Sequence, residues 1–406
     1  MNRIYRFLSL ILPFALLLGG CGREEAAEAP PAEGTVALTV WGAGEDEALL
    51  QEIFESFEAQ YPDTDFAFSF EPQSESGCKD ALLGDLMNGA DVFTFADDQL
   101  SALAAAGALE PIENADAIRS ANLSSTIDAA SVDGTLYAYP LTADNGYFLY
   151  YNKEYISDGD AASLERILEV AEDAGLDFAM DWSSAWYVYA FFGNTGLTVG
   201  LNDDGITNYC TWNSTENAIQ GVDVARAMVE IADSPGFRSC TDEEFLAGVR
   251  NGSVLAGVSG VWNAVAIEEI WGEHMGASKL PTYLCAGQPL QMASFSGCKL
   301  VGANAYSEQP EWAARLAEWI TNEKNQRLRF ELRGQGPSNT RAAASEEVQS
   351  SPAIAALLAQ SEFSQLQRVG GNFWQPVTDF TAVMLDGDTD DLQEKLDTLV
   401  EGISAR

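Results

Sequence analysis

The sequence predicts an α/β protein in which a parallel sheet is covered by helices. Strand-like and helix-like segments alternate along the chain, the chain has 406 residues, and 47% of them are hydrophobic. That length corresponds to roughly two to three domain-sized units and allows a large core without disulfide staples. The hydrophobic fraction is that of an ordinary globular protein, so most of the chain is not disordered.

The first strand and helix follow residue 35. Residues 38–41 (LTVW) are β-prone, and residues 42–44 (GAG) form a turn. Hydrophobic residues then recur at helical spacing until Pro62 ends the helix; they are Leu49, Leu50, Ile53, Phe54 and Phe57.

Later segments continue this alternation. Residues 65–71 and 91–95 read as strands on either side of a segment with Leu82, Leu83, Leu86 and Met87. The β-α-β-α order implies a parallel sheet, whose ligands bind at the carboxyl ends of the strands, here residues 41–45 and 95–98. Residues 310–334 read as one helix, which begins at Pro310 and ends at Gly334.

The charge excludes several classes of partner. The chain has 62 acidic and 21 basic residues, a formal net charge of −41. Such a charge repels phosphate backbones and anionic headgroups, so we expect no nucleic-acid partner. His274 is the single histidine, which argues against multi-histidine metal sites and restricts any Ser-His-Asp triad to that residue. We expect no metal, no cofactor and no catalytic residues.

The amino-terminal residues predict export and lipidation. Arg3 and Arg6 precede an apolar run, residues 7–18, that is short for a membrane-spanning helix and typical of a signal peptide. The run ends in Leu18-Gly19-Gly20-Cys21, which resembles the bacterial lipobox. We therefore predict a signal peptide at residues 1–20 and a diacylglyceryl group on Cys21. The alternative is an ordinary secretory signal with a chance cysteine.

A tether is predicted to follow Cys21. Residues 23–34 (REEAAEAPPAEG) are polar and rich in Pro, Ala and Glu, so they cannot bury a core. The prediction is a lipidated tether at residues 21–34 and a folded body that starts near Thr35. The protein would be lipid-anchored on the extracytoplasmic face of the bacterial cell membrane.

Five cysteines remain after Cys21, without C-x-x-C spacing. A structural zinc site is therefore disfavoured. Outside the cytoplasm, Cys210 could pair with Cys240 and Cys285 with Cys298. Buried free thiols are the other interpretation.

Several stretches together resemble the extracellular solute-binding proteins of ABC importers, and within them the maltose-binding protein cluster. They are LTVWGAGEDEALLQEIFESFEAQYP from Leu38, NGADVFTFADDQLSALAAAGALEPI from Asn88, VDGTLYAYPLTADNGYFLYYNKEYI from Val132, NGSVLAGVSGVWNA from Asn251, SFSGCKLVGANAYSEQPEWAARLAEWITNEKNQ from Ser294, and FWQPV from Phe373. The arrangement DG-x-x-YA-x-P followed by YYNK, in residues 133–153, is the most specific of them.

The resemblance implies a two-lobed periplasmic-binding-protein-like fold, each lobe a mainly parallel sheet flanked by helices, with a hinge between the lobes. The N-terminal lobe would comprise residues 35–143 and 296–340, and the C-terminal lobe residues 146–294 and 345–406. The chain would cross between lobes near residues 142–146, 294–297 and 338–345, which contain Gly, Ser and Asn, residues that can absorb hinge rotation.

The resemblance also implies a ligand site in the interlobe cleft. A neutral oligosaccharide needs aromatic rings for its apolar faces and carboxylates or amides for its hydroxyl groups. The matching positions are Trp41, Glu45, Phe95, Asp98, Asp144, Asn145, Trp186, Tyr187, Trp262 and Trp374. The aromatic residues Phe95, Tyr187 and Tyr189 could instead belong to the core, and Asp98 and Asp144 could cap helices.

The sequence departs from the familiar maltose-binding pattern at two positions. Asp46 follows the first-loop acid where that pattern has lysine, and Gln99 replaces an arginine beside Asp98. The identity of the oligosaccharide therefore stays open, with a maltodextrin favoured because SFSG and RGQGPSN resemble maltodextrin-type binders.

The function implied is that of a monomeric, non-enzymatic lipoprotein. It would capture a neutral oligosaccharide by closure of its lobes and deliver it to the transmembrane subunits of an ABC permease. The alternatives are an anchored glycoside hydrolase, for which the 62 acidic residues offer many carboxylate pairs, and a surface carbohydrate-binding or sensor protein without a transport role.

Overall fold

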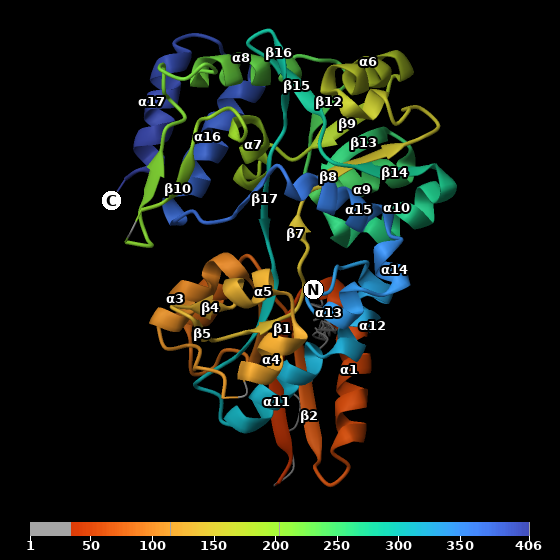
Figure 1. Cartoon of the computed structure of the whole chain (residues 1–406), viewed down its shortest axis with the longest axis vertical. Coiled ribbons are helices and arrows are strands. Elements are labelled where there is room, and N and C mark those ends of the chain that lie inside the picture. The colour runs from red at the N-terminus through yellow and green to blue at the C-terminus, as the bar shows by residue number, and fades with distance from the viewer. Residues whose placement is uncertain (1–33, 114, 203, 406) are drawn as a thin grey trace, which may run out of the picture.

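The computed structural model describes residues 34–113, 115–202 and 204–405. The predicted signal peptide, Cys21 and nearly all of the predicted tether lie outside these residues. In the described part, two α/β lobes are stacked along the long axis of the molecule (Figure 1). The two-lobed fold class predicted from the resemblance is confirmed.

The N lobe is built on a five-stranded sheet in the order β2-β1-β3-β18-β6. Its strands are β1 (Val36–Gly42), β2 (Phe66–Pro72), β3 (Val92–Ala96), β6 (Tyr139–Pro140) and β18 (Lys299–Ala303). Its helices are α1 (Glu47–Gln60), α2 (Cys78–Gly84), α3 (Leu100–Ala105), α4 (Ala115–Ala121), α5 (Ser124–Ala129), α11 (Pro310–Ile320) and α12 (Glu323–Arg333), with the hairpin of β4 (Ser131–Val132) and β5 (Thr135–Leu136).

The C lobe is built on a second five-stranded sheet in the order β12-β9-β13-β8-β14. Its strands are β8 (Phe148–Asn152), β9 (Asp177–Met180), β12 (Phe237–Ser239), β13 (Val254–Ser259) and β14 (Met275–Ser278). Its helices are α6 (Leu164–Ala174), α7 (Ala185–Phe192), α8 (Gly221–Ala232), α9 (Asp242–Asn251), α10 (Ala264–Trp271), α15 (Pro352–Ser361), α16 (Trp374–Leu385) and α17 (Leu392–Ile403). Two hairpins complete it, β10 (Val199–Leu201) with β11 (Asn208–Cys210) and β15 (Thr282–Cys285) with β16 (Gln288–Gln291).

Both large sheets are mixed. In the N lobe, β1 is parallel to β2 and β3, whereas β18 is antiparallel to both β3 and β6. In the C lobe, β9 is parallel to β12 and β13, whereas β8 is antiparallel to both β13 and β14. The parallel prediction therefore holds for three adjacent strands of each sheet. Only β18 and β8 run in the opposite direction, because the chain enters each of them directly from a crossing strand, without an intervening helix.

Two strands run side by side between the lobes in Figure 1, and a third segment pairs with one of them. The strand β17 (Ser294–Gly297) pairs antiparallel with β7 (Asn145–Gly146) and parallel with β19 (Ser364–Leu366). These pairings tie the two crossings to each other, so rotation at one moves the other.

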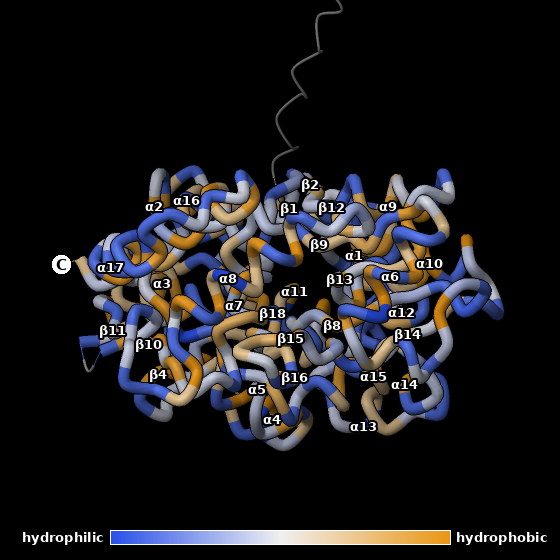
Figure 2. The backbone as a smooth tube through the Cα atoms, turned by 90° about the horizontal axis from the view of Figure 1, so that it is seen from above, coloured by the Kyte–Doolittle hydropathy of each residue, from blue (hydrophilic) through white to orange (hydrophobic). Residues whose placement is uncertain are grey.

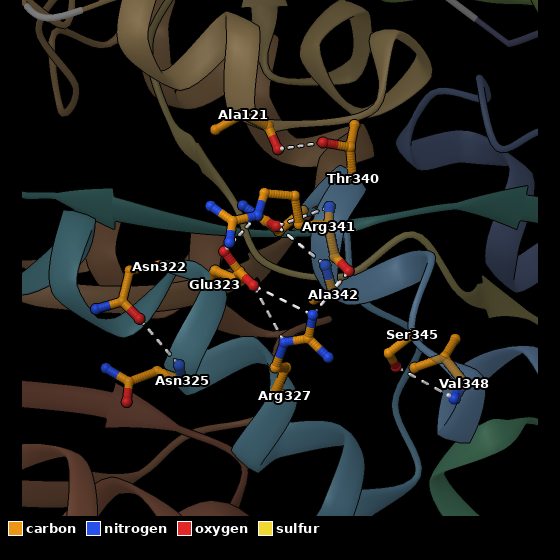
Figure 3. Close-up of polar contacts among 11 residues, drawn as sticks. Ala121, Asn322, Glu323, Asn325, Arg327, Thr340, Arg341, Ala342, Ser345 and Val348 are labelled. Atoms are coloured by element: carbon orange, nitrogen blue, oxygen red, sulfur yellow. Dashed lines mark hydrogen bonds and ion pairs between the residues drawn. The ribbon is translucent and has the colours of Figure 1, made fainter.

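A further connection leaves the N lobe through α13 (Thr340–Ala343) and α14 (Glu346–Gln349). Figure 3 shows that Glu323 of α12 holds it: one carboxylate oxygen accepts from Arg327 at 3.1 Å, and the other pairs with Arg341 at 3.1 Å. Arg327 also donates to the carbonyl oxygen of Arg341 at 2.9 Å, and the Ser345 hydroxyl caps α14 by accepting from the Val348 N–H. The start of this connection is thus fastened to the N lobe.

Hydrophobic side chains form separate cores in the two lobes. Phe57, Phe93 and Phe95 are fully buried in the N lobe, and Trp182 and Trp212 in the C lobe. In the view from above, hydrophilic stretches are frequent around the rim and hydrophobic stretches lie among them and inward (Figure 2). Each lobe therefore has its own core, and Phe330 of the N-lobe helix α12 also packs against a cluster of the C lobe.

Two local expectations are corrected or resolved by the structure. Residues 310–334 form two helices, because Asn322 starts α12 by accepting a hydrogen bond from the Asn325 N–H at 2.9 Å. The five cysteines after Cys21 are free, and four are buried. The pairings Cys210 with Cys240 and Cys285 with Cys298 do not form.

Candidate functional site

Two tryptophan rings lie together on the C lobe. Trp186 of α7 and Trp262 of the 3-10 helix η4 (Val261–Asn263) have ring centroids 5.9 Å apart and an interplanar angle of 38°. Both are half-buried. Tyr147 supports Trp186 from behind, with its ring edge-on at 4.7 Å and its hydroxyl donating to the Trp186 carbonyl at 2.9 Å. The pair is a partly exposed aromatic surface on a rigid base.

Asp242, a residue that sequence reasoning missed, fixes the position of Trp262. It is the first residue of α9, whose start is defined by a capping box between Thr241 and Glu244. Its carboxylate accepts from the Trp262 indole N–H at 2.8 Å and from Ser259 at 2.6 Å. Burial raises the pKa of Asp242, although these hydrogen bonds oppose the shift. The carboxylate is thus committed to holding the ring.

The turn before Trp262 requires glycine for a steric reason. A β carbon on Gly260 would lie 2.0 Å from Cζ3 of the Trp262 ring. The Gly260 carbonyl accepts from the Tyr150 hydroxyl at 3.0 Å, which anchors the turn to β8. The indole therefore occupies the space that a side chain at residue 260 would need.

An acidic pair faces the C-lobe chain from the N lobe. Asp97 and Asp98 begin the 3-10 helix η2 (Asp97–Gln99) at the carboxyl end of β3. Arg368 donates to Asp97 at 2.8 Å, and Gln367 donates to one oxygen of Asp98 at 2.8 Å. The other carboxylate oxygen of Asp98 is buried and has no hydrogen-bond partner among the described residues.

Asp98 is also electrostatically unusual. Its pKa is raised from 3.8 to about 6, first by burial and then by the charge of Asp97, although the hydrogen bond from Gln367 opposes the shift. A buried acceptor without a donor is costly, so a ligand hydroxyl would relieve the cost.

Lys299, also missed from the sequence, connects the two surfaces. Its ammonium group lies 3.1 Å from a carboxylate oxygen of Glu75 in the N lobe and 5.8 Å from the ring centroid of Trp262 in the C lobe. The side chains of Lys299 and Glu75 are 12% and 16% exposed. This is a direct side-chain contact between the lobes.

Asp144 and Asn145 lie at the first crossing. Asp144 is buried and accepts from the Gly336 N–H, while Asn145 pairs with Gly297 in the crossing strands. Burial raises the pKa of Asp144. A cavity beside them is lined by segments 143–146 and 294–297 and by residues from α15 to the start of β19, and it contains none of the tryptophans. The contacts of Asp144 are those of a residue that holds the crossing.

The family model described as "Bacterial extracellular solute-binding protein" matches residues 52–356. The chain belongs to this family.

Individual relatives extend the match to most of the chain. The galactooligosaccharide-binding protein of Bacillus subtilis (strain 168) is 26% identical over 365 residues, 86% of this chain and 84% of the relative. The maltodextrin-binding protein MdxE of the same organism is 26% identical over 298 residues, 69% of this chain and 68% of the relative. A solved structure with acarbose has a TM-score of 0.82 and 29% identity, and it covers 91% of this chain and 99% of that one.

In this solute-binding protein, one predicted contact residue is placed in the core. Phe95 has no exposed surface and packs against Phe93 at 5.6 Å. The strand β3 continues to Ala96, and its first four residues are buried because both faces of the sheet are covered. This position agrees with the alternative interpretation, in which Phe95 belongs to the core.

The remaining predicted residues are dispersed. Tyr187 is 5% exposed and packs behind the tryptophan pair on Tyr147 at 4.9 Å. Trp41 is half-buried and donates to Glu71 at 2.8 Å, and Glu45 is exposed in the 3-10 helix η1 (Gly44–Asp46). Trp374 is half-buried at the start of α16, edge-on to Phe373 at 5.1 Å. Trp186 thus contacts two other predicted aromatic residues, Trp262 at 5.9 Å and Tyr187 at 5.2 Å.

Neither a metal nor a membrane span is indicated in the part of the chain that the structure describes. It contains no group of three or more His, Cys, Asp and Glu residues arranged to hold a metal ion. Within the same residues, no helix combines the length and the hydrophobicity needed to cross a membrane.

Proposed function

We propose that this solute-binding protein captures a neutral oligosaccharide, with a maltodextrin favoured, between its lobes and delivers it to an ABC permease. The observation that carries the proposal is the paired rings of Trp186 and Trp262, with the unpartnered oxygen of Asp98 on the opposite lobe. Aromatic faces suit the apolar faces of a sugar, and the carboxylate suits its hydroxyl groups. The names of the galactooligosaccharide and maltodextrin relatives support the same ligand class.

The proposed site uses both lobes. Trp186, Trp262 and Trp374 would supply the stacking surfaces, while Asp98, Glu45 and Trp41 would meet the sugar from the N lobe as the hinge closes. Asp144 and Asn145 would act at the crossing itself. We retain the lobe bounds of residues 35–143 with 296–340 and 146–294 with 345–406, and we propose that the protein acts as a monomer.

Calorimetry tests the proposed ligand. Maltotriose, longer maltodextrins and galacto-oligosaccharides would be titrated into the wild-type protein, with tryptophan fluorescence as a second readout. We expect saturable binding of at least one series and a change in emission. If no neutral oligosaccharide binds, the carbohydrate proposal is wrong.

Binding without turnover separates this proposal from a glycoside hydrolase. His274, the single histidine, is half-buried, and its side chain lies 3.7 Å from Glu154. We expect no release of reducing ends when the pure protein is incubated with maltodextrins. A rate that one carboxylate substitution abolishes would establish a hydrolase instead.

Anchoring through Cys21 belongs to the same proposal. A lipidated cysteine at the end of a flexible tether would keep the folded body near the permease on the extracytoplasmic face of the membrane. The family description places such proteins outside the cell, and the lipobox-like run before Cys21 supports the anchor.

A further inference from the structure

The side chain of Lys299 lies where the two lobes meet, and its contacts leave part of its hydrogen-bonding capacity unused. Its backbone is fixed because its N–H donates to the Thr142 hydroxyl at 3.3 Å and its carbonyl accepts from the Leu141 N–H at 2.9 Å. These hydrogen bonds therefore hold the backbone of Lys299, at the start of β18, in a fixed position beside the first crossing.

The ammonium group carries three hydrogens. Among the described residues, its recorded contacts are the ion pair with Glu75 at 3.1 Å and the position over Trp262 at 5.8 Å. One carboxylate and one ring face leave hydrogens without an oxygen acceptor. Because the side chain is only 12% exposed, water cannot fully replace the missing acceptors.

The group is charged. Burial alone would lower the pKa of Lys299, but the carboxylates of Glu75, Asp144 and Asp46 outweigh it and the pKa is raised. A cation over an indole face is attracted to it, so Lys299 and Trp262 hold each other across the lobe boundary. A pyranose stacked on Trp262 would bring its edge oxygens beside this ammonium group.

We propose that Lys299 is a ligand-binding and specificity-determining residue, which donates hydrogen bonds to hydroxyl or ring oxygens of a sugar stacked on Trp262, with Glu75 holding the ammonium group in place. The inference rests on the proposed oligosaccharide function and names the residue that donates hydrogen bonds to the ligand. Because Glu75 already neutralises the charge, the site takes a neutral ligand rather than an anionic one.

Calorimetry with maltotriose tests this assignment. Lys299→Met removes the charge and keeps the length of the side chain, and it should weaken binding about 10- to 100-fold, as expected when hydrogen bonds from a charged donor are lost. Lys299→Arg should recover most of the affinity. Lys153→Met, at an exposed lysine on the C lobe, is the matched control and should bind as wild type does.

A double-mutant cycle separates ligand contact from a structural role. If Lys299 and Trp262 hold the same sugar, the combined loss in Lys299→Met/Trp262→Ala should be smaller than the sum of the two single losses. A purely structural lysine would lower the melting temperature and leave the affinity unchanged. Should Lys299→Met fail to fold because Glu75 is left unpaired, the variant Lys299→Met/Glu75→Gln removes both charges and should show the same loss of affinity.

The outcomes also separate this assignment from the proposed function. If the wild-type protein binds maltotriose and a folded Lys299 variant binds within about twofold of it, the role of Lys299 is refuted and the oligosaccharide function stands. If the wild-type protein binds no neutral oligosaccharide, both are refuted.

Discussion

Trp262 has three different neighbours, and each restricts it in a different way. Asp242 fixes the indole nitrogen, Trp186 packs beside the ring, and Lys299 lies over one face. A ring held from several sides is pre-organised, so little conformational entropy remains to be lost when a ligand stacks on it. This is the physical reason to treat Trp262 as a platform rather than as a surface residue.

Removal of that platform should weaken ligand binding without unfolding the protein. Trp262→Ala deletes an apolar face whose burial contributes roughly 1–3 kcal/mol, so we expect affinity for maltotriose to fall by about 5- to 150-fold in calorimetry. Trp374→Ala should have an effect of the same order. Wild-type affinity in both variants would place the ligand elsewhere.

Trp312 offers a matched control because it is a tryptophan in a different place. It packs edge-on against Tyr61 at 5.1 Å and Phe66 at 5.0 Å in the N lobe. Trp312→Ala should lower the free energy of unfolding by about 2–4 kcal/mol and leave affinity nearly unchanged. Because Trp312→Ala and Trp262→Ala remove the same type of side chain, a difference in affinity between the two variants reflects where the side chain lies.

Asp98 should make stability depend on pH. Its pKa is raised from 3.8 to about 6 by burial and then by Asp97, so the folded protein holds this proton more tightly than the unfolded chain does. The ionised carboxylate of Asp98 therefore destabilises the folded protein. This destabilisation is absent below the unfolded pKa of 3.8, grows as the pH rises from there to about 6, and is complete above about 6.

Asp98→Asn should remove this dependence, because an amide cannot ionise and its oxygen can still accept from Gln367. At neutral pH we expect it to raise the free energy of unfolding on the order of 2 kcal/mol, with no gain in acid. Urea titrations across the pH range measure it, and Asp63→Asn, at an exposed aspartate, is the control. An unchanged pH slope in Asp98→Asn would contradict the assignment.

At the scale of the element, the turn between β13 and α10 shapes the site. Gly260→Ala would place a β carbon 2.0 Å from the Trp262 ring, so the ring must move. We expect affinity for maltotriose to fall about tenfold and the tryptophan emission of the free protein to change. Gly159→Ala has an ordinary φ of −73° and no atom closer than 3.7 Å to the new carbon, so it should change neither.

The elements differ in how far the sequence could predict them. The helix α1 and the strands β1 to β3 were predictable because their periodicity is set by burial within each segment. The break between α11 and α12 was missed although residues 321–327 contain no hydrophobic residue, and the cap at Asn322 is its local signal. Phe95 was predicted to lie at the end of its strand, but β3 continues for one more residue, to Ala96.

The aromatic residues of the candidate site could be proposed from the sequence more readily than its polar ones. Trp186 and Trp262 were marked by their residue type and by the Ser and Gly residues that precede them, although the structure places them in α7 and η4. Lys299 and Asp242 depend on partners that local sequence does not specify, Glu75 and Trp262, and sequence alone gives no reason to prefer this lysine over others. A single sequence does not reveal side-chain contacts that form only when the fold brings distant segments together.

At the scale of the whole molecule, charge and lipid should act in opposite directions. A net charge of −41 repels anionic membrane surfaces, so the folded body should not hold itself there. We predict that wild-type protein enters the detergent phase with membranes and that Cys21→Ala is uncleaved or released without lipid. Cys210→Ser, at another cysteine, should stay anchored. Mass spectrometry that finds the same lipid on wild type and Cys21→Ala would refute the anchor.

The position of β18 also determines when the N lobe can be completed during synthesis. This strand lies between β3 and β6, and β6 has no other neighbour in its sheet. The ribosome must therefore produce residues 1–298 before the strand that joins β3 to β6 appears. The C-lobe helices α16 and α17 come later still. Neither lobe can fold completely until most of the chain has been synthesised. We therefore expect folding to be slow, because it depends on contacts between residues far apart in the sequence, and we expect the growing chain to need protection from aggregation until almost all of it has emerged.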